Sequence, residues 1–130
     1  MGWAAVRVLV CGGREYDDPS AMREVLVELP LTAIIIHGAA RGADTMAGYV
    51  GRALGFWVWA CPAEWKGLGK TAGFQRNQRM LDEARPELVL AFPGGAGTAD
   101  MVRRATKAGI RLLKCPCSPE AVREAWRGVP

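Results

Sequence analysis

Residues 92–100 have the composition of an anion-binding turn. They read Phe-Pro-Gly-Gly-Ala-Gly-Thr-Ala-Asp and separate an apolar, strand-like run from a helix-like segment. Glycines leave backbone N–H groups uncovered by side chains, and the following helix directs the positive end of its dipole at the same place. A phosphate group suits such a turn. The residues expected to hold it are Pro93, Gly94, Gly95, Gly97 and Thr98.

Two further glycine-containing segments follow apolar runs, at residues 12–15 and 38–44. Each segment contains one arginine, Arg14 or Arg41. Arginine side chains commonly form charge-assisted hydrogen bonds to phosphate groups. Asp44 accepts a hydrogen bond from a ribose hydroxyl on one interpretation and caps the next helix on the other. The candidate ligand residues of these two segments are Gly12, Gly13, Arg14, Gly38, Arg41, Gly42 and Asp44.

A helical segment from about residue 72 carries two further candidates. Arg76 and Met80 fall on one face of this helix. Arg76 is a candidate ligand residue on that face. Asn77 is either a surface residue or a ligand contact, and both interpretations stay open. His37 ends an apolar run, where we expect a packed or hydrogen-bonded histidine rather than a general base.

Two other motifs are weaker signals. The sequence Gly67-Leu68-Gly69-Lys70-Thr71 ends like a P-loop, but Glu64 stands where the P-loop has its first glycine, and Pro62 separates the motif from the preceding apolar run. Cys115 and Cys117 form a close pair, yet the chain has a single histidine and no second cysteine pair. We therefore expect neither an ATPase site nor a metal, and no cofactor.

The elements that position these residues alternate along the chain. Five apolar runs, at residues 5–11, 32–37, 56–61, 87–92 and 110–115, have the nearly continuous Val, Ile and Leu content of buried parallel strands. Helical segments fall between them: one ends near residue 29, three begin near residues 43, 72 and 98, and a last one follows Ser118-Pro119. Asp18-Pro19 and Ser118-Pro119 are helix-start signals.

This alternation predicts an α/β, Rossmann-like domain of three layers. We expect a parallel sheet of about five strands in the order 3-2-1-4-5, within a single domain of residues 1–130. Ligands of such sheets bind beyond the carboxyl ends of the strands, where the strand order reverses. The three glycine-containing loops should meet there, between the first and fourth strands, and favour an anionic or nucleotide ligand.

Composition limits the class of protein. The chain has 130 residues and a formal charge of +4, without a basic stripe, so nucleic acid is not the expected partner. No apolar run reaches the roughly 20 residues that span a bilayer, and residues 1–10 do not read as a signal peptide. Four cysteines outside a disulfide pattern favour a reduced, cytoplasmic protein. We expect the five tryptophans to pack rather than to stack on bases.

Several motifs occur in a fixed order. They are residues 10–14 (Val-Cys-Gly-Gly-Arg), 37–44 (His-Gly-Ala-Ala-Arg-Gly-Ala-Asp), 63–65 (Ala-Glu-Trp), 69–73 (Gly-Lys-Thr-Ala-Gly), Arg76-Asn77 with Met80, and 91–101. Together they resemble the YspA-like branch of the SLOG superfamily over residues 5–115. The resemblance implies a Rossmann-like fold and a ligand of the nucleotide, NAD or ADP-ribose type.

The same superfamily contains the LOG phosphoribohydrolases, whose signature is Pro-Gly-Gly-x-Gly-Thr-x-x-Glu with an arginine on the preceding helix. Residues 93–98 match the loop and Arg76 matches the arginine, but Met101 stands at the glutamate position. A thioether neither stabilises a developing positive charge nor activates water as a carboxylate does. Asp100 lies about 100° around the helix and would act from another direction.

Three functions follow as hypotheses. The first is a module that binds or senses a nucleotide-type ligand. The second is an enzyme that hydrolyses the N-glycosidic bond of nucleoside 5′-monophosphates, with Arg76 as phosphate anchor and Asp100 or Glu15 as carboxylate. The third is single-stranded DNA binding, because DprA proteins share a related fold. We expect a homodimer formed by the apolar helix face that includes Met101, Val102 and Ala105.

Overall fold

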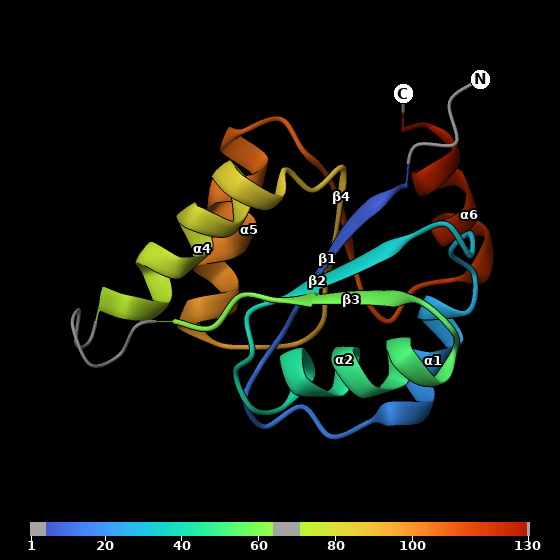
Figure 1. Ribbon diagram of the computed structural model, residues 1–130, viewed down its shortest axis with the longest axis horizontal. Helices are drawn as coiled ribbons and strands as arrows, with labels where there is room; N and C mark the ends of the chain where they lie inside the picture. The colour runs from blue at the N-terminus through green and yellow to red at the C-terminus, as the bar shows by residue number, and fades with distance from the viewer. Residues whose placement is uncertain (1–4, 64–70, 130) are drawn as a thin grey trace.

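The computed structural model describes residues 5–63 and 71–129, and within them five parallel strands form one sheet (Figure 1). The order β3-β2-β1-β4-β5 is the predicted one, and all four neighbouring pairs are parallel. Each strand is one or two residues shorter at one or both ends than its apolar run. The strands are β1 (Arg7–Cys11), β2 (Ile34–His37), β3 (Trp57–Ala60), β4 (Leu88–Ala91) and β5 (Arg111–Lys114).

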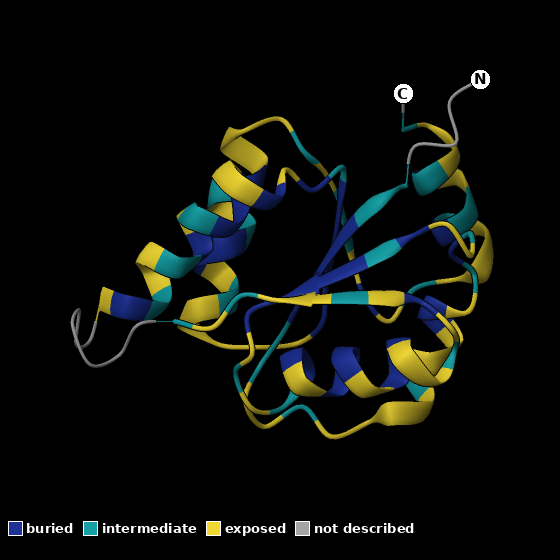
Figure 2. Ribbon diagram, viewed as in Figure 1, coloured by how far each residue is buried: buried dark blue, intermediate teal, exposed yellow. Residues whose placement is uncertain are grey.

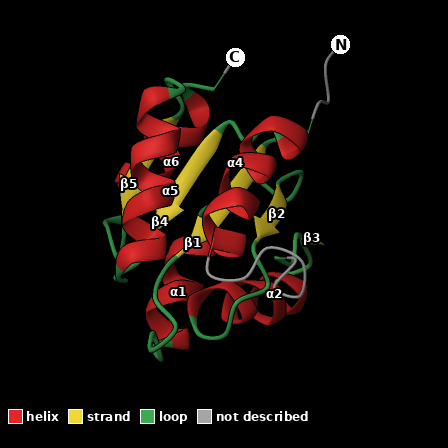
Figure 3. Ribbon diagram, turned by 90° about the vertical axis from the view of Figure 1, so that its left-hand side faces the viewer, coloured by secondary structure: helices red, strands yellow, loops and turns green. Residues whose placement is uncertain are grey.

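Helices cover both faces of the sheet, which confirms the α/β, Rossmann-like class. One face carries α1 (Pro19–Leu26), α2 (Ala43–Ala53) and α6 (Pro119–Arg127). The other face carries α4 (Ala72–Ala84) and α5 (Ala96–Lys107). Figure 1 shows α4 and α5 together on one side and α1 and α2 on the other, and Figure 3 turns the α4 and α5 side toward the viewer.

The helix boundaries follow local chemistry. The predicted starts at Asp18-Pro19 and Ser118-Pro119 are confirmed, since Asp18 Oδ1 accepts from Ala21 N at 3.0 Å and Ser118 Oγ accepts from Ala121 N at 3.1 Å. Helix α1 ends at Leu26 rather than near residue 29, because the N–H groups of Glu28 and Leu29 bond to carbonyl oxygens three residues back, at 3.2 and 3.1 Å, in place of helical bonds. Helix α5 begins at Ala96, two residues earlier than predicted.

Alternate residues of the strands face two apolar layers, and the central strands are buried except at Arg7 and Ile34, which are half-buried (Figure 2). Val8 and Val10 of β1 pack toward α1, α2 and α6, whereas Leu9 and Cys11 pack toward α4 and α5. The apolar layer between the sheet and helices α4 and α5 includes Met101 of α5, which is almost fully buried. Burial on both faces explains why these strands lack strict alternation in the sequence.

The helix face expected to form a dimer is used inside the protein. Met101 and Ala105 of α5 are buried against the sheet and α4, and Val102 packs partly against the same layer. Because a buried face cannot meet a second subunit, these residues do not form a dimer interface. A homodimer itself stays a prediction. Among the described residues, no helix is both long and apolar enough to cross a membrane.

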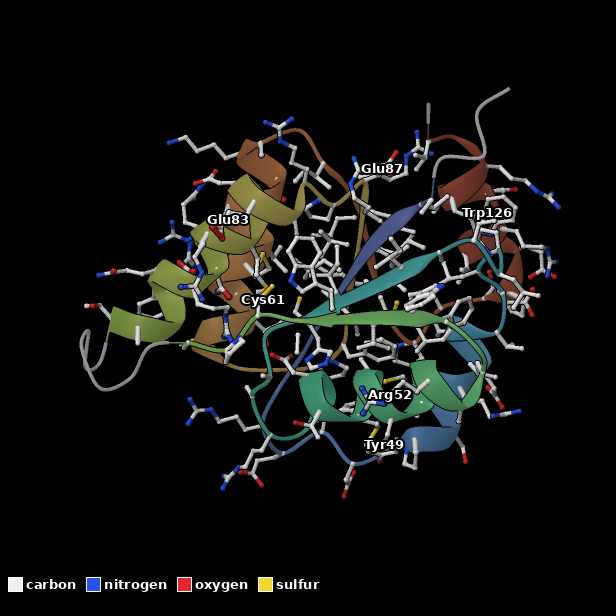
Figure 4. All side chains as sticks on the ribbon, viewed as in Figure 1. Tyr49, Arg52, Cys61, Glu83, Glu87 and Trp126 are labelled. Carbon is white, nitrogen blue, oxygen red and sulfur yellow. The ribbon has the colours of Figure 1, made fainter. Side chains whose placement is uncertain are left out.

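The tryptophan expectation is wrong for two residues on β3. Trp57 is 80% exposed and Trp59 is 43% exposed, because β3 is the edge strand and their side of it extends beyond the cover of α4. Val58, on the opposite side of the strand, packs toward α2 as expected. Trp126 of α6 also packs against the core, and its Nε1 donates to Glu28 O at 2.8 Å (Figure 4). Trp3, Trp65 and most of the P-loop-like motif lie outside the described residues.

Candidate functional site

A cavity of about 870 Å³ opens at the carboxyl ends of β1 and β4, the point where the strand order reverses. This volume is in the range of small-molecule sites. The three glycine-containing loops and the first turns of α4 and α5 form its walls. The lining residues are Cys11, Gly12, Gly13, Arg14, Glu15, Tyr16, Asp17, Ala40, Asp44, Gly73, Phe74, Arg76, Asn77, Met80, Pro93, Gly94, Gly95, Ala96, Gly97, Thr98 and Met101.

Backbone hydrogen bonds join the three loops around Gly13. Its N–H donates to Pro93 O at 2.8 Å, and its carbonyl oxygen accepts from Ala43 N at 3.1 Å. Main-chain bonds at Gly13 therefore hold the loop after β1 to both of the other loops. Gly42, the residue before α2, has a φ of +80° and packs against Gly13 O and Arg14 O, so it shapes this junction and does not line the cavity.

Two glycines are needed because the loops approach too closely for side chains. A Cβ on Gly12 would lie 2.5 Å from Ala43 Cβ, and one on Gly94 would lie 2.6 Å from Gly13 N. Real Cβ atoms essentially never approach so closely, so a larger residue at either position displaces the backbone. The floor of the cavity thus consists of closely packed main chain.

The N-terminus of α5 presents backbone N–H groups at the cavity wall. Gly95 precedes the helix and makes no side-chain capping bond, and the first helical bond outside the regular ladder runs from Ala99 N to Gly95 O at 3.0 Å. The N–H groups of the preceding residues have no acceptor within the helix. A Cβ on Gly95 or Gly97 would meet no heavy atom within 4 Å. This end of the helix is therefore open to an anion.

Asp44, in the first turn of α2, places a buried carboxylate in the wall of the cavity. It is only 5% exposed, and its Oδ2 accepts from Ala40 N at 3.4 Å. Burial raises the pKa of Asp44 to about 6, although the nearby charge of Arg76 and backbone hydrogen bonds favour the ionised form. A carboxylate of this kind can accept hydrogen bonds from a ligand hydroxyl and exchange a proton near neutral pH.

Arg76 lies between Asp44 and the end of β3. Its Nη1 donates to Gly38 O and lies 3.5 Å from the carbonyl oxygen of Cys61, the residue after β3 labelled in Figure 4, and its Nε donates to Asn77 Oδ1 at 3.2 Å. Burial lowers the pKa of Arg76, and the charge of Asp44 opposes that shift. The guanidinium is thus held in place at the wall of the cavity.

Asp100 points into a network between helices. Its Oδ2 accepts from Asn77 Nδ2 at 3.0 Å and from Arg104 Nε at 2.8 Å, and its Oδ1 lies 3.6 Å from Arg103 Nη2. Asp100 is absent from the residues that line the cavity. This placement argues against a catalytic role for Asp100, because its carboxylate joins α4 to α5.

A second cavity of about 380 Å³ adjoins the first and shares Arg14, Ala40 and Arg76 with it. Its other described lining residues are Gly38, Ala39, Arg41, Pro62 and Ala63. Arg41 is largely exposed and forms an ion pair with Glu15, with 2.5 Å between Nη2 and Oε1. The structure therefore divides the predicted ligand residues between two neighbouring cavities.

His37 and Cys11 have structural surroundings. His37 is buried, its Nδ1 accepts from Ala39 N at 3.0 Å, and burial together with Arg52 and Arg76 lowers its pKa to about 4. It is therefore neutral at pH 7 and packed, as expected. Burial also raises the pKa of the Cys11 thiol to about 12, so this residue lines the cavity as a neutral group.

Most predicted ligand residues come together in the larger cavity. Gly38 and Arg41 line only the smaller one, and Gly42 lines neither. Sequence reasoning missed the apolar wall formed by Tyr16, Phe74 and Met80. The sequence did indicate the position of Met80. It follows Gly73 and Arg76-Asn77 at steps of three or four residues, so these residues share one face of α4.

The fold and these cavities define a class: a Rossmann-like α/β protein whose ligand cavity lies at the topological switch point. The chain belongs to the YspA, cpYpsA-related SLOG family, whose model matches residues 6–67. It is similar to the Gene 61 protein of Mycobacterium phage D29, with 33% identity in an alignment that covers 82% of this chain and 94% of the phage protein. The resemblance inferred from the ordered motifs is confirmed.

Solved structures agree on the fold. DNA processing protein A (DprA) from Streptococcus pneumoniae has a TM-score of 0.73 and 18% identity over 95% of this chain, which spans 54% of the DprA chain. A UDP-N-acetylglucosamine 2-epimerase has a TM-score of 0.52 and 13% identity over 97% of this chain, which spans 40% of that enzyme. At these identities the likeness shows the fold alone.

Proposed function

We propose that the larger cavity binds a nucleotide-type ligand and holds its phosphate at the N-terminus of α5. The observation that supports this most is the open first turn of α5 in the wall of a cavity of about 870 Å³. Backbone N–H groups and the helix dipole favour an anion there. Arg14 adds a positive charge to the same cavity. A nucleoside monophosphate, NAD or an ADP-ribose derivative carries the required group.

The rest of the cavity suits the uncharged parts of a nucleotide. Asp44 offers carboxylate oxygens to ribose hydroxyls, and Phe74 and Met80 offer apolar surface to a base. Such a mixture of a few polar groups with apolar walls is typical of small-molecule sites. We also propose that residues 1–130 act as one domain in the cytoplasm, where the four unpaired cysteines stay reduced.

Isothermal titration calorimetry with AMP and adenosine tests the proposal, because the two ligands differ only in the phosphate. AMP should bind at least tenfold more tightly than adenosine, since the phosphate reaches the N–H groups of α5. NAD and ADP-ribose should bind in the same cavity and compete with AMP. Equal affinity of AMP and adenosine, or no heat with either at millimolar concentration, contradicts the proposal.

A second candidate function is hydrolysis of the N-glycosidic bond of a nucleoside 5′-monophosphate, which gives the free base and ribose 5-phosphate. The observation that favours it is Asp44, a carboxylate in the cavity with a pKa of about 6. Water supplies the hydroxyl group of the sugar product and the proton taken up by the base. Asp44 would stabilise the positive charge that develops on the ribose.

Incubation with AMP and chromatography of the products tests this enzyme. Release of adenine that is lost in Asp44→Asn, with folding unchanged by circular dichroism, supports it. Release of adenine at the same rate in Asp44→Asn assigns the reaction to another group, and no release from any nucleoside monophosphate leaves the binding function alone.

A further inference from the structure

The smaller cavity combines three positive charges with no acidic lining residue among those the structure describes. Arg14, Arg41 and Arg76 come from the β1 loop, the β2 loop and α4, so the tertiary fold gathers them from distant parts of the sequence. Among the described residues, Glu15 pairs with Arg41 and Asp44 accepts from Ala40 N, and both carboxylates line the larger cavity. The chemistry of the smaller cavity is therefore that of an anion site built from guanidinium groups.

Two backbone N–H groups of this cavity already make internal bonds. Ala39 N donates to His37 Nδ1 at 3.0 Å, and Ala40 N donates to Asp44 Oδ2 at 3.4 Å. The arginine side chains supply the positive charge that attracts an anion. Arg76 is held by its Nε and Nη1, whereas the Arg41 side chain is 72% exposed in an ion pair with Glu15. Exposed ion pairs are weak, so an anion can compete for Arg41.

The two cavities form one continuous binding region. They share Arg14, Ala40 and Arg76, and the Arg41–Glu15 pair joins a lining residue of the smaller cavity to one of the larger. A ligand that places one phosphate on α5 in the larger cavity can extend past Asp44 toward the three arginines. The combined space exceeds what a nucleoside monophosphate needs.

We propose that the ligand carries a second phosphate group, which the smaller cavity binds through Arg41 together with Arg14 and Arg76. This inference rests on the proposed nucleotide-binding function and selects, among the nucleotide-type ligands proposed there, those with two phosphate groups. Arg41 distinguishes the second group from the first, since it lines the smaller cavity and not the larger one.

The experiment compares AMP with adenosine 3′,5′-bisphosphate and ADP-ribose by calorimetry on the wild-type chain, Arg41→Gln and a control. Arg23→Gln is the matched control, because Arg23 is exposed on α1 and lines neither cavity. Circular dichroism checks that each variant folds. A single-stranded oligothymidylate of ten nucleotides serves as a further ligand, since its backbone also carries separated phosphates.

The proposal predicts that at least one two-phosphate ligand binds fivefold or more tightly than AMP. Arg41→Gln should reduce this advantage at least threefold while AMP affinity changes less than twofold, and Arg23→Gln should leave the advantage in place. The second subsite is overturned if the two-phosphate ligands bind less than fivefold more tightly than AMP, or if their tighter binding survives in Arg41→Gln. Binding of AMP in the same experiment would still support the proposed function. Tighter binding of the oligothymidylate than of both small ligands also overturns it. Failure of AMP to bind contradicts the proposed function itself.

Discussion

Gly94 and Gly97 lie three residues apart in the same turn, yet a methyl group at each would meet very different surroundings. At Gly94 the added Cβ would overlap Thr98 Oγ1, whereas at Gly97 no heavy atom lies within 4 Å. Gly97 is within α5, and Cβ atoms of a helix tilt toward its N-terminus. A methyl group there therefore enters the region in which the phosphate should bind.

Gly97→Ala should separate binding from folding. Alanine favours a helix over glycine by about 1 kcal/mol, so the free energy of unfolding should stay equal or rise slightly. AMP affinity should fall at least fivefold, because the methyl group obstructs the open N–H groups. Urea denaturation and calorimetry measure the two quantities. Gly94→Ala is the contrasting variant and should lose stability, and unchanged AMP affinity in a folded Gly97→Ala variant would place the phosphate elsewhere.

Asp44 should make stability depend on pH in a direction opposite to most carboxyl groups. Its pKa is raised by burial from 3.8 to about 6, so between these values the folded chain keeps a proton that the unfolded chain has lost. The stabilising contribution of the protonated form is complete below pH 4 and is lost as the pH rises to 6. Ionised Asp44 thus destabilises the unliganded protein at pH 7.

Asp44→Asn should remove this pH-dependent contribution to the free energy of unfolding. A shift of about 2 pH units corresponds to about 3 kcal/mol, so the variant should gain up to that amount of stability relative to the wild-type chain between pH 4 and pH 7. Urea denaturation of both proteins at several pH values measures the difference. A difference that is constant across this range would show that Asp44 titrates normally in the folded state.

At the scale of elements, α4 and α5 are joined by a buried polar network. Asn77 Nδ2 donates to Asp100 Oδ2 and, at 3.1 Å, to Gly97 O, so the amide links α4 to the first turn of α5. Arg104 completes the network from the next turn of α5. The network fixes the helix end that should receive the phosphate.

Asn77→Ala should therefore destabilise the protein by about 2 kcal/mol, because it removes the hydrogen bonds of the buried Asn77 amide to Asp100 Oδ2, Gly97 O and Arg76 Nε. Gln75→Ala on the same helix is exposed and should change the free energy of unfolding by less than about 0.5 kcal/mol. Chemical denaturation of both variants supplies the comparison. Equal effects of the two substitutions would mean that the Asn77 bonds contribute no net stability.

Elements were predictable from sequence where a local signal was strong. The apolar runs indicated each strand to within two residues per end, and Asp18-Pro19 and Ser118-Pro119 indicated two helix starts. The direction of individual side chains was harder to predict from the sequence. Asp100 follows the glycine-rich turn in sequence, but α5 turns it toward Asn77 and away from the cavity, and only the packing of α4 on α5 shows this.

For the whole molecule, the order of the strands predicted the location of the cavity, since parallel α/β sheets place their ligands at the switch point. The composition of the walls could not be predicted in the same way. Tyr16 reaches the cavity from the β1 loop, and its ring packs against Phe92 at a tilt of 56° with 5.2 Å between the centroids. Phe74 reaches the cavity from α4. These contacts join residues far apart in the sequence, and no spacing rule links them.

The exposure of Trp57 and Trp59 depends on the assembled sheet, because it follows from the position of β3 at the sheet edge. A local apolar run looks the same at the edge of a sheet as at its centre. The division of the arginines between two cavities is likewise a property of the assembled fold, and the three residues show no periodicity that links them along the chain.

An amide NMR titration of the ¹⁵N-labelled chain with AMP, with adenosine as control, tests directly whether a phosphate group binds at the N-terminus of α5. AMP should shift the N–H resonances of Ala96, Gly97 and Thr98 at the start of α5, and adenosine should shift them far less. Unchanged resonances for these three residues at millimolar AMP, or shifts confined to a surface away from the cavity, would contradict phosphate binding at this helix end.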